Sequence, residues 1–237
     1  MPTVLVTGAN RGLGLEFVRQ YAADGWQVFA ACRVPGAAAE LDELTARYPA
    51  AIGVQALDVT SPDSIERLAQ DLAGESIDVL INNAGVFGPR PTADGDPRQS
   101  FGHLDGGAWL DVMRVNALAP MLLTQALVEN VAASDQKKVV AISSELGSIA
   151  GTSGGLYAYR ASKAALNMVM ASYAVELAAR GILVGIYCPG WVKTAMGGPE
   201  APRTPAESIA ALRTRIAALT PADSGQFRLY DGTPIAW

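Results

Sequence analysis

Cysteine, histidine and clustered basic residues are scarce in this sequence, and each scarcity argues against a class of function. The two cysteines, Cys32 and Cys188, are too few to suggest a disulfide framework. The single histidine, His103, has neither a second histidine nor a Cys-x-x-Cys pair beside it, so we expect an ordinary loop residue and no bound metal. A net charge of -5 without a basic run argues against a nucleic-acid surface.

Long apolar runs are also missing. The strand-like N-terminal run is soon interrupted by Arg11 and Glu16, and no apolar stretch reaches the ~18 residues of a membrane span. The sequence therefore predicts no signal peptide, no membrane partner and a cytoplasmic protein. Half of the 237 residues are nevertheless hydrophobic, which is enough to build one sizeable core in a single domain spanning 1–237.

Short buried runs alternate with helical patterns along the chain. We expect strands at 4–6, 27–32, 52–57, 77–81, 138–142, 182–187 and 226–230, with helices that include 15–21, 63–70, 108–131, 164–179 and 204–219. Strands that alternate with helices form parallel sheets with right-handed crossovers. The predicted fold class is therefore α/β: a single-domain Rossmann-type, doubly wound parallel sheet of about seven strands with helices on both faces. Residues 86–107 read as a loop or short insert without chemistry of its own, although its position could place it near a substrate.

A glycine-rich loop, Gly8-Ala-Asn-Arg-Gly12-Leu-Gly14, joins the first expected strand to the first expected helix. Glycines let the backbone turn tightly and approach a pyrophosphate, and a helix N-terminus offers N–H groups and a positive dipole to the anion. The spacing is not the commoner G-x-G-x-x-G, and a tight structural turn is the alternative interpretation. The framing by a strand and a helix favours a nucleotide site.

The end of the second expected strand indicates which nucleotide this is. Arg33 stands where NAD-binding proteins usually carry an acidic residue, and Arg11 adds a second cation in the glycine loop. Two arginines suit a 2′-phosphate, so the sequence predicts NADP, in the reduced form NADPH. The alternative for Arg33 is a solvated loop charge. Asp58 and Asn82 fall at the ends of the next two strands.

Tyr159 and Lys163 are four residues apart, so they share one face of a helix. An ammonium beside a phenol favours the phenolate, which predicts a pKa below the unperturbed value of about 10. Such a phenol suits a general acid for carbonyl reduction. The alternative is two unrelated residues on one helix face.

Together these stretches resemble the short-chain dehydrogenase/reductase family, in its compact single-domain branch. The matching stretches are Thr7-Gly-x-x-x-Gly-x-Gly14, Asp58, Asn82-Asn-Ala-Gly85, Asn116, Ser143-Ser144, Tyr159-x-x-x-Lys163 and Pro189-Gly190. Residues 7–14, 153–167 and 196–199 further resemble the carbonyl reductase subgroup that includes C-factor and Sniffer.

The resemblance implies four catalytic residues. Tyr159 would protonate the carbonyl oxygen as hydride arrives from the nicotinamide, and Lys163 would hold the nicotinamide ribose and tune Tyr159. Asn116 would support a proton-relay water, and a serine would orient the carbonyl. Family members commonly keep this serine closer to the tyrosine than Ser143 or Ser144 lies here. Spacing leaves both open, and we favour Ser144.

The resemblance also implies cofactor contacts along the strand ends. These residues are Gly8, Asn10, Arg11, Gly12, Leu13, Gly14, Arg33, Asp58, Val59, Asn83, Ala84, Gly85, Tyr159, Lys163, Pro189, Gly190, Val192 and Thr194. Asp58 would contact the adenine, 83–85 would line the adenosine side, and Gly190, Val192 and Thr194 would hold the carboxamide end.

Two functions follow from the resemblance. The first is an NADPH-dependent oxidoreductase that reduces a carbonyl (ketone, aldehyde or quinone) to an alcohol with a Ser-Tyr-Lys-Asn site. The alternative is an NADP-binding regulatory or signalling protein of C-factor type with little or no turnover. The intact set of catalytic residues favours chemistry on a small-molecule substrate. We also expect a homodimer or homotetramer, paired through the helices that carry Asn116 and Tyr159.

Pro120 suggests a further feature of the expected helix at 108–131. Proline has no N–H, so the carbonyl of Asn116, four residues earlier, loses its usual helical partner. We expect a kink there, and a water on that carbonyl that returns protons towards Lys163 and Tyr159. The alternative is that Pro120 only bends the helix around the core.

Overall fold

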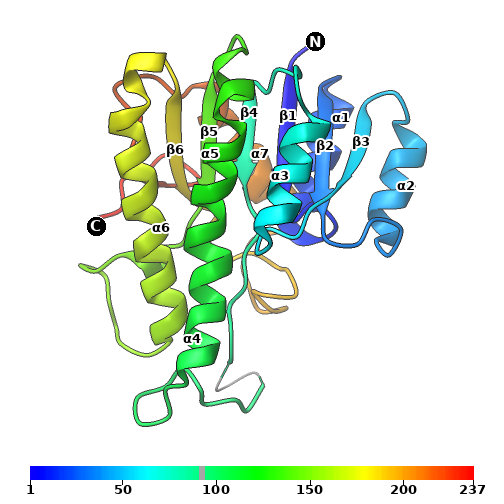
Figure 1. Ribbon diagram of the computed structural model, residues 1–237. Coiled ribbons are helices and arrows are strands. Elements are labelled where there is room, and N and C mark those ends of the chain that lie inside the picture. The colour runs from blue at the N-terminus through cyan, green and yellow to red at the C-terminus, as the bar shows by residue number, and fades with distance from the viewer. Residues whose placement is uncertain (91–93) are drawn as a thin grey trace.

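The computed structural model describes residues 1–90 and 94–237, and its centre is a seven-stranded sheet whose strands pair in parallel in the order β3-β2-β1-β4-β5-β6-β7 (Figure 1). The strands are β1 (Thr3–Thr7), β2 (Gln27–Cys32), β3 (Ile52–Ala56), β4 (Val79–Asn82), β5 (Lys138–Ile142), β6 (Leu183–Cys188) and β7 (Phe227–Leu229). The predicted α/β fold class is confirmed.

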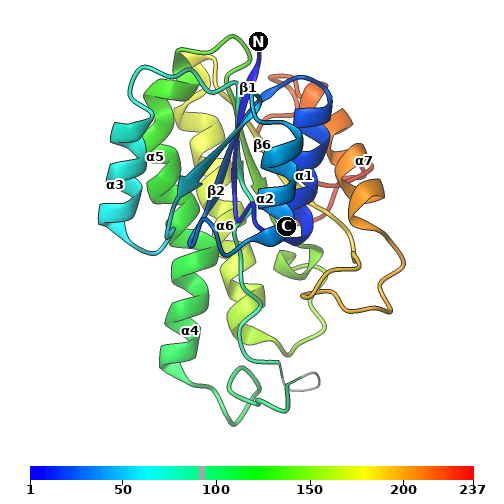
Figure 2. The same ribbon diagram turned by 90° about the vertical axis from the view of Figure 1, so that its right-hand side faces the viewer.

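Helices cover both faces of this sheet (Figures 1 and 2). The helices and helical turns are α1 (Gly12–Ala23), α2 (Ala39–Arg47), α3 (Pro62–Asp71), α4 (Gly106–Met113), η1 (Arg114–Leu118), α5 (Ala119–Ala132), η2 (Glu145–Gly147), α6 (Tyr157–Glu176), η3 (Ala178–Arg180) and α7 (Pro205–Ala217). Helices α1, α2 and α7 form one layer, and α3, α5 and α6 form the other.

Alternating side chains of the strands supply both cores. In β1, Val4 and Val6 face the core shared with α1, α2 and α7, whereas Leu5 faces the core shared with α3, α5 and α6. A strand buried on both faces reads as an uninterrupted apolar run, which is why Thr3–Thr7 was recognisable from sequence. Each fully buried large side chain, such as Phe17, contributes roughly 1.5–3 kcal/mol of stability.

Two helix starts follow the capping chemistry that the sequence predicts. Ser61 accepts a hydrogen bond from the backbone N–H of Ser64, with Pro62 in the first turn of α3. Thr204 and Glu207 form a reciprocal capping box that begins α7. These short-range contacts satisfy N–H groups that a helix leaves free at its start.

The strand order reverses between β1 and β4. We call the space outside the carboxyl ends of these two strands the crevice. Open parallel sheets bind ligands outside the carboxyl ends of their strands at such a point. The segments that follow β4, β5 and β6 all extend beyond this edge, in the lower part of Figure 1. The chain around the crevice therefore comes from parts of the sequence that are far apart.

The long helix expected at 108–131 is divided in the structure. It consists of α4, the π-helical turn η1 and α5, and the backbone N–H of Ala119 donates to the carbonyl of Arg114, five residues back. Where the sequence predicts a kink near Pro120, the structure has a π turn that contains Asn116. In the described ranges, no helix combines the length and apolar character that crossing a membrane requires.

Candidate active site

The glycine loop after β1 forms a cradle at the crevice. Gly8 and Gly12 have left-handed φ angles of 64° and 56°, which glycine adopts without strain. A Cβ on Gly14 would lie 2.1 Å from the Gly8 carbonyl oxygen, so only glycine fits there. Arg11 precedes α1 without capping it by a side-chain hydrogen bond. A close backbone approach and free N–H groups at a helix start fit a pyrophosphate.

Thr7 joins this cradle to the segment after β4. Its hydroxyl accepts hydrogen bonds from the backbone N–H groups of Asn83 (3.0 Å) and Ala84 (2.9 Å). The Asn83 amide in turn donates to the Thr7 carbonyl at 2.8 Å. The carboxyl ends of two adjacent strands are thereby held in one geometry, and Asn83 also lies beneath Gly8 and Gly14.

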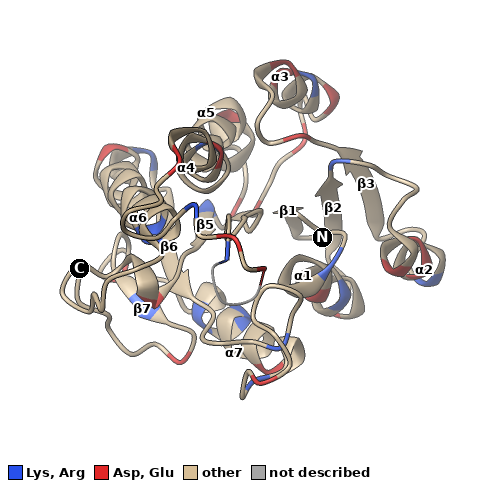
Figure 3. Ribbon diagram, turned by 90° about the horizontal axis from the view of Figure 1, so that it is seen from below, with Lys and Arg blue, Asp and Glu red and all other residues tan. Residues whose placement is uncertain are grey.

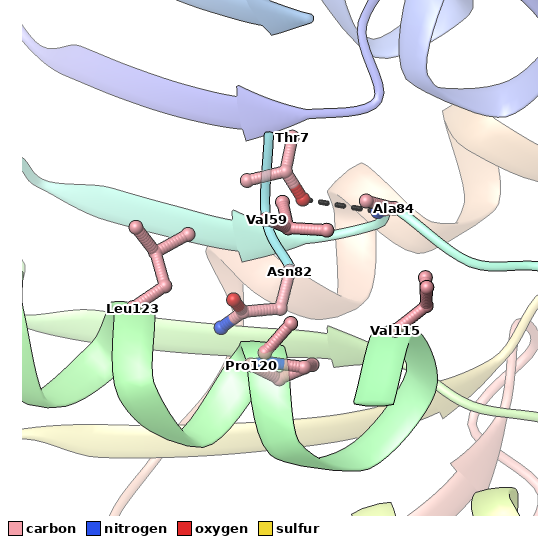
Figure 4. A pocket seen from close by; sticks show the side chains of 8 residues that line it. Thr7, Val59, Asn82, Ala84, Val115, Pro120 and Leu123 are labelled. Atoms are coloured by element: carbon pink, nitrogen blue, oxygen red, sulfur yellow. Dashed lines mark hydrogen bonds between the residues drawn. The ribbon is translucent and has the colours of Figure 1, made fainter. Parts of the chain in front are cut away.

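A small pocket opens beside this junction (Figure 4). It is lined by Thr7, Val59, Asn82, Ala84, Val115, Ala119, Pro120 and Leu123. Two of the predicted cofactor residues, Val59 and Ala84, are therefore brought together, and Val115 faces them from the π turn.

Arg33 and Asp58 lie at the neighbouring strand ends, where Arg33 is exposed and Asp58 is half-buried. The Asp58 Oδ1 atom accepts hydrogen bonds from the Thr60 backbone N–H (2.9 Å) and hydroxyl (2.7 Å). These bonds, with a smaller contribution from the Arg33 charge, hold the pKa of Asp58 below its usual value. Arg11 is exposed as well. Figure 3 views the molecule from this edge, with basic residues in blue.

Tyr159 and Lys163 are both buried on one face of α6, as their spacing predicts. The Lys163 ammonium donates to the Ile142 carbonyl at 2.8 Å and lies 5.8 Å from the centre of the Tyr159 ring. Burial lowers the pKa of Lys163 to about 8 and raises the pKa of Tyr159 to about 12, although a hydrogen bond with Ser144 opposes the second shift.

The expected direction of the tyrosine shift was therefore wrong. The Lys163 ammonium lies 5.8 Å from the centre of the phenol ring, and it is not among the groups that lower the pKa of Tyr159. Removing the phenolate from water destabilises it more than its neighbours stabilise it. At neutral pH Tyr159 is thus a protonated donor.

The two candidate serines face different surroundings. Ser143 is buried, and its hydroxyl donates to Asn167 Oδ1 at 2.5 Å. Ser144 is half-buried, accepts a hydrogen bond from the Leu146 backbone N–H at 3.2 Å and interacts with Tyr159. Geometry places Ser144, and not Ser143, beside the phenol.

The Asn116 side chain hydrogen-bonds to two segments of the site. Its side-chain amide accepts from the Val86 backbone N–H and donates to the Val86 carbonyl, both at 2.8 Å. It also donates to the Ser162 hydroxyl at 3.0 Å, which in turn donates to the Tyr159 carbonyl at 2.7 Å. These hydrogen bonds commit the side chain to joining the segment after β4 to α6, so the side chain is not free to hold the expected water.

The segment after β6 closes the other side of the crevice. Gly190 has a φ of 77°, and a Cβ there would come within 3.0 Å of the Tyr230 ring. The Pro189 carbonyl accepts from the Ser208 hydroxyl at 2.8 Å, which ties the segment to α7. A Cβ on Gly12 would lie 3.6 Å from Thr194, so the predicted residues of the two sides approach each other.

Sequence reasoning missed two residues between 86 and 107. The Phe87 ring stacks on Tyr159, with centroids 4.4 Å apart and planes tilted by 27°. Gln99 is fully buried and hydrogen-bonds to the Tyr159 backbone. Phe87 follows closely on the Asn-Asn-Ala-Gly motif, which was a usable signal, whereas no sequence signal distinguishes Gln99. The loop therefore contacts Tyr159 directly, which the sequence did not predict; residues 91–93 lie outside the described residues.

Metal ligands do not gather within the described residues, where no group of three His, Cys, Asp or Glu side chains could hold an ion. Cys32 and Cys188 are both free and buried. Burial raises the pKa of the Cys188 thiol, which favours a packed thiol at the end of β6 over a nucleophile.

Two relatives have sequences similar to this chain. C-signal from Myxococcus xanthus is 38% identical over 162 residues, which are 68% of this chain and 93% of that protein. The 1-hydroxy-2-glutathionyl-2-methyl-3-butene dehydrogenase of Rhodococcus sp. (strain AD45) is 35% identical over 244 residues and covers 100% of both chains.

Solved structures agree over the full length. The carbonyl reductase Sniffer of D. melanogaster is 33% identical with a TM-score of 0.87 and covers 100% of both chains. The NADPH-bound carbonyl reductase from chicken fatty liver is 34% identical with a TM-score of 0.90 and covers 100% of this chain and 99% of that one. A family model described as short chain dehydrogenase matches residues 2–204. The chain therefore belongs to the short-chain dehydrogenase family.

Proposed function

We propose that this protein uses NADPH to reduce a carbonyl, in a ketone, aldehyde or quinone, to an alcohol. The observation that carries the proposal is the convergence of Ser144, Tyr159 and Lys163 at one edge of the sheet, opposite the glycine cradle. A proton donor and an anion-binding cradle on two sides of one crevice are what this reaction needs. Solved relatives with bound NADP or NADPH support the choice of cofactor.

The chain offers a separate group for each part of the dinucleotide. The glycine cradle and the start of α1 would bind the pyrophosphate. Arg11 and Arg33 would bind the 2′-phosphate, and Asp58 would contact the adenine. Val59 and Ala84 would line the adenosine side, and the segment 189–194 would hold the carboxamide end. When bound, NADPH supplies the hydride.

The catalytic side chains provide the proton and the orientation. We infer that Tyr159 donates its proton to the carbonyl oxygen, because a phenol with a pKa of about 12 is fully protonated at neutral pH. The Ser144 hydroxyl would hold the same oxygen in place. Lys163, with a pKa of about 8, keeps most of its charge at pH 7 and stabilises the phenolate that forms. Packing of Phe87 on Tyr159 limits access of water.

Proton return is proposed to run through Asn116. Pro120 cannot donate to the Asn116 carbonyl, and the π turn changes the helical pairing around it. A water held by that carbonyl would pass protons to Lys163. Pro120→Ala tests this role, because it restores the missing N–H. We expect slower turnover with unchanged NADPH affinity; an unchanged rate in a folded variant would leave Pro120 as a bend only.

A regulatory role is the second candidate, and the similarity to C-signal favours it. The two functions are separated by measuring NADPH consumption with a panel of ketones, aldehydes and quinones beside a direct titration of NADPH and NADH. We expect turnover with at least one carbonyl and tighter binding of NADPH. Tight NADPH binding without turnover of any carbonyl would contradict the enzymatic proposal and support the regulatory one.

We also propose that the protein pairs with a second copy of itself. Large apolar side chains are exposed along the helices that carry Asn116 and Tyr159: Leu110, Leu118, Met168 and Val175. Burying such residues against a symmetric partner removes apolar surface from water. Light scattering should give the mass of a dimer or tetramer, and the double substitution Met168→Glu with Val175→Glu should reduce it. A monomeric mass at working concentration would contradict this proposal.

A further inference from the structure

Gln99 is a buried amide, whereas the other described side chains between 94 and 105 are exposed or half-buried. It is 0% exposed, whereas its neighbour Arg98 is exposed and Phe101 is 83% exposed. A buried glutamine is stable only when its donors and acceptor are paired. Its partners therefore indicate what this side chain holds.

The start of α6 is one of these partners. Leu156 precedes the helix in a left-handed conformation, with a φ of 48°, and provides no side-chain cap. Gln99 supplies the missing acceptors from outside the helix. The backbone carbonyl of Gln99 accepts a hydrogen bond from the Tyr157 backbone N–H at 3.3 Å. The side-chain Oε1 accepts one from the Tyr159 backbone N–H at 3.2 Å. These N–H groups belong to the first turn, which a helix cannot satisfy itself.

The segment that carries Phe87 is the other partner. Gln99 Nε2 donates to the Phe87 carbonyl at 3.1 Å and also to the Pro89 carbonyl. Gly88 between them has a φ of 76°, and a Cβ there would lie 2.6 Å from Val112, so this segment is packed without spare room. One amide group thus holds the backbones of Phe87 and Tyr159, whose rings stack 4.4 Å apart.

We propose that Gln99 is the positioning residue of Tyr159. It fixes the first turn of α6 and the Phe87 ring against each other, so that the phenol stays in place when its proton leaves. The inference rests on the proposed role of Tyr159 as proton donor. Gln99 touches neither substrate nor cofactor in this account, and its effect runs through the backbone of Tyr159 and the ring of Phe87.

The test compares Gln99→Met, Gln99→Glu and a matched control. Methionine keeps the length of the side chain but removes its donors and acceptor, whereas glutamate keeps the acceptor and, when protonated, one donor. Asn130→Leu is the control, because Asn130 also donates from a side-chain amide to two loop carbonyls, of Leu72 (2.7 Å) and Glu75 (2.8 Å). It lies at the far end of α5, beside the start of β4, away from the crevice.

Turnover number, NADPH dissociation constant and thermal unfolding midpoint are measured on each variant. We expect Gln99→Met to lower the turnover number by roughly 10- to 100-fold, because displacement of a reacting group by about 1 Å can cost that much. NADPH affinity should stay within about twofold, since no cofactor contact is removed. Gln99→Glu should lose less turnover and recover more of it as pH falls and the introduced carboxyl gains a proton.

Asn130→Leu should lower the unfolding midpoint and leave the turnover number unchanged. Turnover equal to that of the unmutated protein in folded Gln99→Met would overturn the inference, as would an equal loss in Asn130→Leu. If Gln99→Met does not fold, Gln99→Glu decides by the same comparison: normal turnover at neutral pH, with no gain at lower pH, overturns the inference. Tyr159→Phe, measured in parallel, distinguishes a failure of this inference from a failure of the proposed function. Full activity in that variant would show that Tyr159 is not the proton donor.

Discussion

The starts of α1 and α6 both lie at the carboxyl edge of the sheet, and their first turns are completed in opposite ways. At α1 the glycine cradle brings exposed backbone to the crevice, and no side chain caps the helix. At α6 the first turn is buried, and Gln99 supplies its acceptors. Unsatisfied N–H groups suit an arriving anion, whereas satisfied ones fix a side chain. The difference fits our proposal that the start of α1 binds NADPH and the start of α6 carries the reacting side chain.

Tyr159→Phe is the strongest test of this division. The ring and its stacking on Phe87 remain, and only the proton donor is lost. We expect turnover to fall by at least ~10²-fold, as for other general acids, while NADPH affinity changes little. Steady-state kinetics and a cofactor titration on one preparation measure both. Near-normal turnover would place the proton donor elsewhere.

Gly14→Ala tests the other helix start. The added Cβ would lie 2.1 Å from the Gly8 carbonyl oxygen, so the cradle must shift. We expect NADPH affinity to fall by about tenfold or more, because one well-made charge-assisted contact is worth roughly that much. Calorimetric titration measures the loss, and Gly106→Ala is the control, because Gly106 does not have a positive φ and a Cβ there meets no atom within 4 Å. Unchanged affinity in a folded Gly14→Ala variant would show that the cradle is not the binding site.

Arg33→Asp should change which cofactor is preferred. Loss of one guanidinium–phosphate pair weakens NADPH binding by about tenfold, and the new carboxylate can accept from the ribose hydroxyls of NADH. Dissociation constants for both cofactors should therefore converge or reverse. Equal constants in the unmutated protein would contradict the assignment of Arg33 and Arg11 to a 2′-phosphate.

The pH dependence of turnover tests whether the reaction needs the charged form of Lys163. Burial lowers its pKa from 10.5 to about 8, so activity that needs the ammonium should fall as pH rises through about 8. The free energy of unfolding should instead rise over the pH range in which activity falls. Between about pH 8 and 10.5 the unfolded chain binds the proton that the folded chain has released, so the contribution of Lys163 to the unfolding free energy rises with pH. A rate that stays flat from pH 7 to 9 would contradict the role of the ammonium.

Thr204→Ala gives the smallest effect and serves as a reference for the other two helix starts. The capping box of α7 is made by its own residues, Thr204 and Glu207. Its loss should reduce the free energy of unfolding by about 1 kcal/mol, measured by urea denaturation. Turnover and NADPH affinity should remain unchanged. A loss of NADPH affinity as large as that of Gly14→Ala would show that the way a helix start is completed does not distinguish the binding site from the rest of the fold.

Local patterns explain what could be predicted from the sequence. The strand 27–32 was correct to the residue because a continuous apolar run lies between Gly25 and Arg33, and the capping box of α7 is a short-range signal. The order of the glycine, tyrosine and lysine motifs was sufficient to indicate the family. These features depend on neighbours in sequence, so they are visible without the fold.

Contacts between distant segments explain what was missed. Gln99 lies 60 residues before Tyr159, and nothing near it in sequence indicates that it is buried. The direction of the Tyr159 pKa depends on burial and on where Lys163 points, which spacing cannot show. The π turn around Asn116 likewise depends on packing, and Pro120 alone predicted only a kink.

Isotope transfer tests the central claim most directly. The protein is incubated with NADPH that carries deuterium at the transferable position of its nicotinamide and with the carbonyl panel, and the alcohols are analysed by mass spectrometry. The account predicts deuterium on the carbinol carbon of at least one product, and about a hundredth of that amount or less with Tyr159→Phe over the same time. Alcohol formed without deuterium, or no alcohol from any carbonyl despite tight NADPH binding, would contradict it.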